Sequence, residues 1–191
     1  KQLDDNCIQH HPSIDSYSKD SKSRLVTVPN GKVHVEPYGA YPIKIKNVAE
    51  LKVGALISIP TDPTNGRRAL ILLAKQGLIE LKDPASLTPT PLDIVKNPKK
   101  LKFKELEAPL LPRALADVDL ALINTNYAIE AKLNPTKDAL FIEGADSPYT
   151  NIVAARKDRA DGADIAKLMK ALHSPETKQF ILDKYHGAVV P

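Results

Sequence analysis

The sequence predicts an α/β protein with a mostly parallel sheet. Stretches typical of strands alternate along the chain with stretches of helical periodicity, and this alternation favours parallel strands joined by helices. Hydrophobic residues make up 42% and charged residues 26% of the chain, which is ordinary for a globular protein. The 191 residues suffice for one large domain or two small lobes. No apolar run reaches the length of about 18 residues that a transmembrane helix needs.

Strands are predicted where β-branched residues alternate with polar ones or form short apolar runs. Residues 24–28 and 32–36 alternate, and the Pro-Asn-Gly turn at 29–31 separates them. Residues 53–60 form an apolar run typical of a strand buried on both faces. Further strands are predicted at 101–107, 117–123, 139–143 and 151–157.

Helices are predicted where a capping residue and a proline precede a helical pattern. The clearest helix starts with Asp62 as N-cap and Pro63 in the first position, and it runs to Gly77. Ser174 and Pro175 open the last helix, which extends to 186, in the same way. Further helices are predicted at 46–51, 91–97, 108–117, 124–132 and 163–173.

Charge and composition argue against a nucleic-acid partner. Lys and Arg number 27 against 23 Asp and Glu, which leaves a net charge of +4, and the two signs are interspersed. The most basic stretch, residues 96–104, is interpreted as a solvated loop and strand edge. Trp is absent and aromatic residues are 5%, so few side chains could stack on bases. Because Cys7 is the only cysteine, the chain can form neither an internal disulfide nor a cysteine-cluster zinc site.

One strand-to-helix junction has the features of an anion site. The strand ending at Pro60 leads into the helix N-terminus at Asp62, and open α/β sheets bind ligands at such junctions. Arg67 and Arg68 follow in the first two turns, and a guanidinium suits a carboxylate. Both arginines are also compatible with a plain surface position.

Other polar residues give weaker signals. Asn124 follows the predicted strand 117–123, where it could cap a helix or offer its amide to a ligand. His34 and Glu36 could share one face of a strand, but no third ligand is evident, and no metal site is predicted. The sequence contains no nucleophile elbow, no Walker loop and no dinucleotide fingerprint, so neither an enzyme nor a cofactor is predicted.

Six strings in order give the chain a family resemblance. They are QHHP at 9–12, HVEPYGAY at 34–41, IPTDPTNGRRAL at 59–70, LKFKELEAPLLPRALADVDLALINTNYA at 101–128, SPYTN at 147–151 and KYHGAVVP at 184–191. Together they resemble the NlpA lipoprotein family, the methionine-binding, MetQ-type components of ABC importers. The resemblance extends over essentially the whole chain, and the stretch 101–151 is its most specific part.

The resemblance implies a two-lobed periplasmic-binding-protein fold, similar to type II. Residues 1–41 and 148–191 would form a first lobe that is incomplete at the N-terminus, and residues 42–147 would form the second lobe. It implies that methionine, a related amino acid or a methionine-containing dipeptide binds in the interlobe cleft and is delivered to an ABC permease and its ATPase. It also implies a place in the cell envelope, with a lipid anchor outside this sequence.

The resemblance further implies a set of ligand-binding residues. Arg68 matches the arginine that binds the ligand carboxylate, and Asn124 and Asn151 match asparagines that hydrogen-bond the amino-acid backbone. His10 matches a histidine near the ligand side chain. These residue types agree with the chemistry, because a guanidinium pairs with a carboxylate and an amide both donates and accepts.

The chain departs from the family pattern at three places. Ile8 and Ser13 stand where the family usually has aromatic residues that grip the thioether. Arg67 stands between Gly66 and Arg68, which makes Arg67 the alternative partner of the carboxylate.

Two other classes of function share this architecture. One is the effector-binding domain of a transcription regulator, which needs a helix-turn-helix that the sequence does not show. The other is an enzyme such as a transferase, which needs a nucleophile or an acid–base pair. Solute binding is therefore the main hypothesis.

Overall fold

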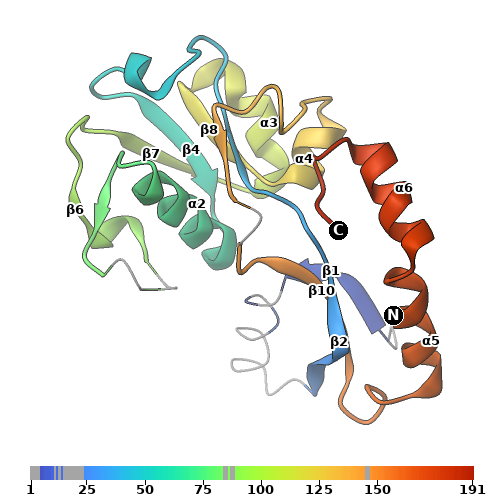
Figure 1. Cartoon of the computed structure of the whole chain (residues 1–191). Coiled ribbons are helices and arrows are strands. Elements are labelled where there is room, and N and C mark those ends of the chain that lie inside the picture. The colour runs from blue at the N-terminus through green and yellow to red at the C-terminus, as the bar shows by residue number, and fades with distance from the viewer. Residues whose placement is uncertain are drawn as a thin grey trace. The chain divides into compact units, whose positions relative to one another are not determined.

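The computed structural model describes residues 5–10, 12, 14, 24–83, 86, 89–144 and 147–191. The chain forms two compact units (Figure 1). Unit 1 comprises Lys1–Glu36 and Ala145–Pro191, and unit 2 comprises Pro37–Gly144. Among the described residues, no helix combines the length and apolar character needed to cross a bilayer. The lobe boundaries at 41/42 and 147/148 stay a prediction.

The described part of unit 1 contains three strands and two long helices. They are β1 (Asp5–His10), β2 (Leu25–Val35), β10 (Thr150–Arg156), α5 (Ala163–Leu172) and α6 (Pro175–Tyr185). The strands form an antiparallel sheet in the order β1-β10-β2. On one face of this sheet Val28 and Val153 pack against Ile165 and Met169 of α5. Burial of this apolar face holds the helix on the sheet.

Strand β2 corrects the first prediction. The two strands predicted at 24–28 and 32–36 are one strand, and the turn predicted at 29–31 is an irregularity within it. Lys32 pairs with Ile152 and Thr27 pairs with Ala154, so β2 has extra residues opposite β10. Asn30 takes up the bend with a φ of 53°. Because both flanks pair with the same neighbouring strand, the turn residues form a bulge and no hairpin.

Unit 2 is built on a five-stranded sheet with short elements around it. Its elements are β3 (Gly39–Tyr41), a 3-10 turn (Val48–Glu50), β4 (Leu56–Pro60), α2 (Pro63–Lys75), β5 (Glu80–Leu81), a 3-10 turn (Pro91–Asp93), β6 (Ile94–Lys96), β7 (Lys102–Leu106), a 3-10 turn (Ala108–Leu110), α3 (Leu111–Ala114), a 3-10 turn (Leu115–Asp117), β8 (Leu120–Ile123), α4 (Thr125–Glu130) and β9 (Phe141–Ile142). The order in the large sheet is β7-β4-β8-β3-β9, and β5 and β6 form a separate pair.

The expectation of a mostly parallel sheet is wrong for the described residues. Only β4 is parallel to its neighbours, β7 and β8, whereas β3 runs antiparallel to β8 and β9. Helical segments connect β4 to β7 and β7 to β8, and such crossovers give parallel pairs. β3 pairs with β8 and β9, which lie far from it in the sequence. The local alternation of strand and helix patterns does not indicate such pairing.

Helices cover both faces of the unit 2 sheet (Figure 1). Leu120 and Leu122 of β8 pack in one cluster with Leu70 of α2. Ala121 and Ile123, which alternate with them, pack in a second cluster with residues of α3 and α4. Strand β8 is therefore buried on both faces, which explains why its sequence is apolar throughout.

Two helices begin at the caps that the sequence predicts. In α2 the Asp62 carboxylate accepts from the Asn65 N–H at 2.9 Å, and Gly77 follows the helix with a φ of 69°. In α6 the Ser174 hydroxyl accepts from the Thr177 N–H at 3.2 Å. Two capped starts read from the sequence are thus confirmed.

Three helix predictions need correction. The segment 91–97 is one 3-10 turn followed by β6, because Asp93 accepts from the Thr90 N–H at 2.8 Å and β6 pairs with β5. The segment 108–117 is a chain of short helical pieces. Two prolines within it remove amide donors that a longer helix would need. The segment 46–51 contains only a 3-10 turn.

Substitution of Gly31 by alanine tests the bulge in β2. A Cβ atom at Gly31 would lie 2.7 Å from the Val28 carbonyl oxygen and 2.9 Å from that of Val153. Both atoms belong to the backbone, so the strand must shift, at a cost of about 1–3 kcal/mol. Chemical denaturation of Gly31→Ala should show this loss, while the exposed control Lys32→Ala should stay within about 0.5 kcal/mol of the parent. Equal stability of both variants would contradict the tight bulge.

Candidate functional site

A buried ion pair fixes the first site residue. Arg68 lies on α2 with 3% of its side chain exposed, and Glu143, just after β9, has 9% exposed. The Arg68 Nε donates to Glu143 Oε1 at 2.8 Å, and Nη2 donates to Oε2 at 2.5 Å. This two-point contact is the geometry in which a guanidinium binds a carboxylate most specifically. The structure therefore already gives Arg68 one carboxylate partner within unit 2.

Tyr38 completes the surroundings of this pair. The Arg68 Cζ lies 5.1 Å from the centroid of the Tyr38 ring, within the range of a cation–π contact. The Tyr38 backbone N–H donates to Glu143 Oε2 at 3.2 Å, and its hydroxyl donates to the Leu122 carbonyl oxygen at 3.0 Å. Complete burial raises the pKa of Tyr38 well above its usual value near 10, although the positive charge of Arg68 opposes the shift.

Asn124 is held by a relay of polar side chains. Asn65 donates from Nδ2 to both carboxylate oxygens of Asp62, each at 3.1 Å. Asn124 Nδ2 in turn donates to Asn65 Oδ1 at 2.9 Å. Because a carboxylate only accepts, Asp62 determines which end of the Asn65 amide faces it, and this determines which end of Asn124 faces Asn65. The Asn124 Oδ1 is buried and makes no hydrogen bond within the described part of the chain.

Arg68 lies near Asn65, the residue of α2 that Asn124 contacts. Asn65, which binds Asn124, and Arg68 are three positions apart on the helix, and such residues are neighbours on its surface. Unit 2 thus brings a buried cation and an amide acceptor to the N-terminal half of α2. The roles of Arg68 and Asn124 in ligand binding stay a prediction.

Unit 1 brings its two predicted residues together on adjacent strands. Asn151 of β10 pairs with His10 of β1 on one side and with His34 of β2 on the other, and all three lie in one row across the sheet. His10 and Asn151 are buried, each with 8% of the residue exposed. The His10 ring meets the ring of Tyr149 edge-on, with 5.2 Å between centroids. Directly opposed residues share a face, so the row forms one polar strip.

Arg67 points to a different place from Arg68. It lines a cavity of about 220 Å³ together with Asp62, Thr90 and Glu105, and Arg68 is not part of that lining. Consecutive residues on a helix are turned by about 100°, which accounts for the separation. Arg68, rather than Arg67, is the arginine that shares a face with the residue binding Asn124.

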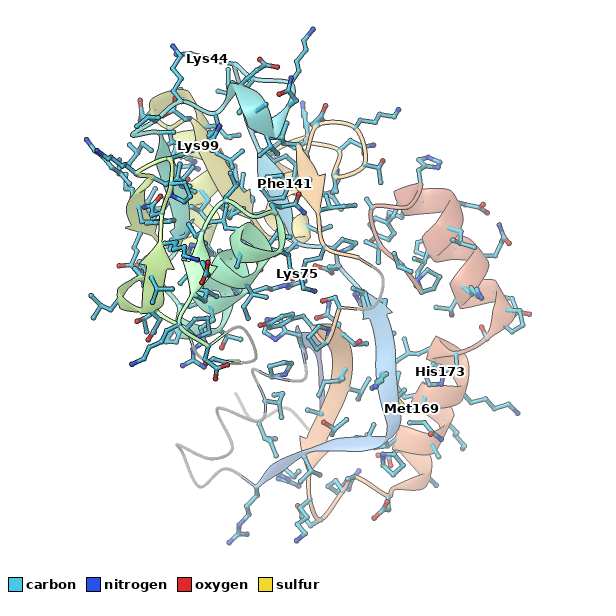
Figure 2. All side chains as sticks on the ribbon, turned by 60° about the vertical axis from the view of Figure 1, so that its left-hand side comes forward. Lys44, Lys75, Lys99, Phe141, Met169 and His173 are labelled. Carbon is cyan, nitrogen blue, oxygen red and sulfur yellow. The ribbon has the colours of Figure 1, made fainter. Side chains whose placement is uncertain are left out.

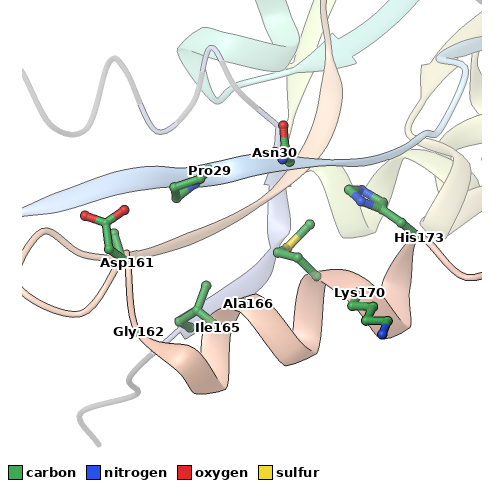
Figure 3. Close-up of a pocket in the computed structure, with 10 residues that line it drawn as sticks. Pro29, Asn30, Asp161, Gly162, Ile165, Ala166, Lys170 and His173 are labelled. Atoms are coloured by element: carbon green, nitrogen blue, oxygen red, sulfur yellow. The ribbon is translucent and has the colours of Figure 1, made fainter.

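A larger cavity of about 320 Å³ lies in unit 1 between β2 and α5 (Figure 3). Pro29 and Asn30 of the bulge line it on one side, and Ile165, Lys170 and His173 line it on the other. It contains none of the residues predicted as ligand-binding. In the described residues no three His, Cys, Asp or Glu side chains come together to hold a metal ion, and the His34–Glu36 pair gains no third member there.

The basic stretch 96–104 is engaged in local contacts. Lys96 pairs with Glu80 at 2.6 Å, and the Lys99 ammonium donates to the Leu51 carbonyl oxygen at 2.6 Å. Lys44, Lys75 and Lys99 project from separate parts of unit 2 (Figure 2). These contacts favour the interpretation as solvated loop and strand edge over a nucleic-acid patch.

Comparison with known proteins identifies the family. The model of the family described as NlpA lipoprotein matches residues 1–191 of this chain. The chain belongs to the NlpA lipoprotein family. The D-methionine-binding lipoprotein MetQ of Salmonella typhi is 47% identical over 190 residues, covering 98% of this chain and 69% of the relative. Outer membrane lipoprotein 3 of Mannheimia haemolytica is 45% identical over 188 residues, covering 98% and 71%.

Solved structures show the NlpA-family fold directly. A nutrient binding protein from Burkholderia cenocepacia, bound to methionine, matches with a TM-score of 0.93 and 46% identity, covering 98% of this chain and 78% of that one. A periplasmic substrate-binding protein of an ABC transporter from Coxiella burnetii matches with a TM-score of 0.93 and 44% identity, covering 99% and 79%. The two-lobed periplasmic-binding-protein fold implied by the resemblance is thereby confirmed.

Sequence reasoning missed the neighbours of the site residues in this NlpA-family chain. Glu143 ends the predicted strand 139–143, and an acidic residue at a strand end was the available signal for it. Tyr38 lies within the string HVEPYGAY without any mark of a contact to Arg68. The sequence marks His34 only as a possible metal ligand with Glu36, and no local pattern indicates its contact with Asn151.

Removal of Glu143 should destabilise unit 2. Glu143→Ala leaves the Arg68 guanidinium buried without this partner, and such a loss typically costs about 3–5 kcal/mol. The double variant Arg68→Met with Glu143→Gln removes both charges and keeps an acceptor for the Tyr38 N–H. Urea unfolding followed by circular dichroism should rank the double variant well above Glu143→Ala. A Glu143→Ala variant as stable as the parent would exclude a structural role for the pair.

Tyr38 should make the protein lose stability in alkali. Its folded pKa is raised, so the folded state keeps the phenol proton, and this contribution is present below about pH 10 and lost as the pH rises above that value. The free energy of unfolding, measured from pH 8 to 11.5, should fall more steeply for the parent than for Tyr38→Phe. Parallel curves for the two proteins would contradict this assignment.

Proposed function

We propose that the chain is the solute-binding protein of an ABC importer and binds methionine or a closely related amino acid. The proposal is carried by the placement of two groups at the N-terminal half of α2. They are the buried guanidinium of Arg68 and the side-chain Oδ1 of Asn124, which contacts Asn65 of that helix. A free amino acid presents a carboxylate and an ammonium group close together, and these are the partners that a guanidinium and a carbonyl oxygen select. Relatives named as methionine-binding proteins support the same ligand.

Arg68 would bind the ligand carboxylate while staying paired with Glu143. A guanidinium has five N–H donors, and the two contacts to Glu143 use two of them. A ligand carboxylate bound at another donor would leave this pair intact. Glu143 holds the guanidinium plane in place beforehand, which lowers the cost of ordering it around the ligand.

Asn124 and Asn151 would bind the amino-acid backbone, and His10 would lie near the side chain. Both asparagines donate from Nδ2 to a neighbour in their own unit, to Asn65 and to His34 respectively. Their carbonyl oxygens then serve as acceptors for the ligand ammonium. The residues come from both units, Arg68 and Asn124 from unit 2 and His10 and Asn151 from unit 1.

The partners follow from this role. We place the protein in the cell envelope, with a lipid anchor that recruits it to the membrane and a permease with its ATPase that receives the ligand. Names of the relatives as lipoproteins and ABC transporter components support this assignment over the regulator and the transferase. A methionine-containing dipeptide is the alternative ligand.

Calorimetric titration with methionine tests the proposal. The parent should bind, and the double variant Arg68→Met with Glu143→Gln should lose about 30-fold to several-thousand-fold in affinity, because the carboxylate loses its charged partner. Arg67→Ala is the matched control, since Arg67 lines a cavity that does not include Arg68. This variant should bind methionine as the parent does.

Circular dichroism of each variant separates loss of binding from loss of fold. A parent that binds neither methionine nor a methionine-containing dipeptide would overturn the proposal. Normal binding by the double variant together with no binding by Arg67→Ala would move the carboxylate site to Arg67. Specific DNA binding that persists at physiological salt would favour the regulator.

A further inference from the structure

The contact between His34 and Asn151 is built into the sheet of unit 1. Asn151 lies opposite His34 in the pairing of β10 with β2, and Asn151 Nδ2 lies 3.0 Å from His34 Nε2. Asn151 has 8% of its surface exposed and His34 has 18% of its side chain exposed. The Asn151 Oδ1 makes no hydrogen bond within the described part of the chain. The amide thus has one end bound and the other available.

The orientation of the amide and the tautomer of the ring are linked. An amide nitrogen only donates, so when Nδ2 faces the ring, His34 Nε2 accepts and the ring carries its proton on Nδ1. With Nδ2 committed to His34, the carbonyl oxygen of Asn151 is directed away from the ring. Were Nε2 protonated, it would donate instead, and the amide would have to turn so that its oxygen faced the ring.

Glu36 gives the ring nitrogen a competing partner. Its Oε1 lies 3.3 Å from the same His34 Nε2, and a carboxylate can only accept. A neutral ring therefore binds Asn151 through Nε2, and a protonated ring donates from Nε2 to Glu36. The two arrangements exclude each other because one nitrogen cannot accept and donate at once.

We propose that His34 is a positioning residue that sets the orientation of the Asn151 amide and so presents its carbonyl oxygen to the ligand. This inference rests on the proposed function, in which Asn151 binds the amino-acid backbone. His34 itself need not touch the ligand. It acts by excluding one of the two orientations that a free amide would adopt. The Asn151 Oδ1 is then the atom that accepts from the ligand ammonium.

The surroundings of His34 define what else could affect it. Glu36 faces it from its own strand, and from β10 the partner is the neutral Asn151. His10 lies in the same row on β1, beyond Asn151.

The other elements packed against β2 contribute different groups. Val33 packs in the cluster with α5, so the alternation of the strand directs His34 to the opposite face. On the α5 side His173 Nε2 contacts the Lys32 carbonyl oxygen at 2.7 Å, and Lys170 lines the cavity there. The C-terminal segment contributes the apolar bridge of Val35 with Val190.

Methionine titration of two matched variants tests the role of His34. His34→Phe keeps a flat ring but removes the acceptor, and it should bind methionine about fivefold to tenfold more weakly. His34→Gln restores an acceptor oxygen for Asn151 Nδ2 and should return the affinity to within about twofold of the parent. Nitrogen NMR of the parent near pH 8 should show His34 Nε2 without a proton.

The pH dependence gives a second readout. A proton on Nε2 would remove the acceptor for Asn151 Nδ2. Methionine affinity of the parent should therefore fall when the pH is lowered, and His34→Gln should lose most of that fall. The remaining dependence in His34→Gln reports the other groups of the row, His10 included.

The outcomes separate this inference from the proposed function. A parent that does not bind methionine contradicts the proposed function and the inference with it. A parent that binds while His34→Phe binds equally well overturns the inference alone. Equal weakening in His34→Phe and His34→Gln assigns the ring a packing role and also overturns it. A proton on Nε2 in the NMR experiment would reverse the amide and exclude the acceptor orientation.

Discussion

The buried pair of Arg68 and Glu143 is the constraint on which the candidate site of unit 2 depends. Two unit charges with 3% and 9% of their side chains exposed need partners, and each satisfies the other at two points. The pair joins α2 to the chain after β9, and Tyr38 ties the same carboxylate to the backbone next to β3. The pair thereby connects α2 with Tyr38 and Glu143, two positions that are distant from it in the sequence.

Both candidate asparagines are oriented by neighbours in their own units. Asn124 receives its orientation from Asn65, whose amide is in turn fixed by Asp62. Asn151 receives its orientation from His34 directly. The difference between the two is chemical, because a carboxylate only accepts whereas a histidine ring nitrogen accepts or donates according to where the ring carries its proton. The orientation of the Asn124 amide is therefore set by an obligatory acceptor, and that of Asn151 depends on the tautomer of His34.

Local signals in the sequence predicted what is locally determined. Asp62 and Pro63 predicted the start of α2, and Ser174 predicted that of α6, because a cap acts on amides within its own turn. The family resemblance led to the fold and to the candidate residues Arg68 and Asn124, of which the first lies on α2 and the second contacts Asn65 of that helix.

Long-range pairing was not accessible in the same way. The bulge at 29–31 follows from both flanks of β2 meeting β10, and the antiparallel place of β3 follows from neighbours far along the chain. Glu143 is 75 positions from Arg68 and His34 is 117 positions from Asn151. No periodicity or motif encodes such distances, so the partners that orient a site are harder to read than the residues that form it.

Under the proposed function, these partners also lower the cost of binding. A ligand that met mobile amides and an unpaired guanidinium would have to order each of them, and each ordered side chain costs about 0.5–1.5 kcal/mol of binding free energy. Here Glu143, Asn65 and His34 have already ordered Arg68, Asn124 and Asn151. The free energy of folding of each unit thus covers most of the cost of arranging its part of the site. In the proposed function, selectivity for an amino-acid backbone would therefore depend on Glu143, Asn65 and His34 as much as on the side chains that would touch the ligand.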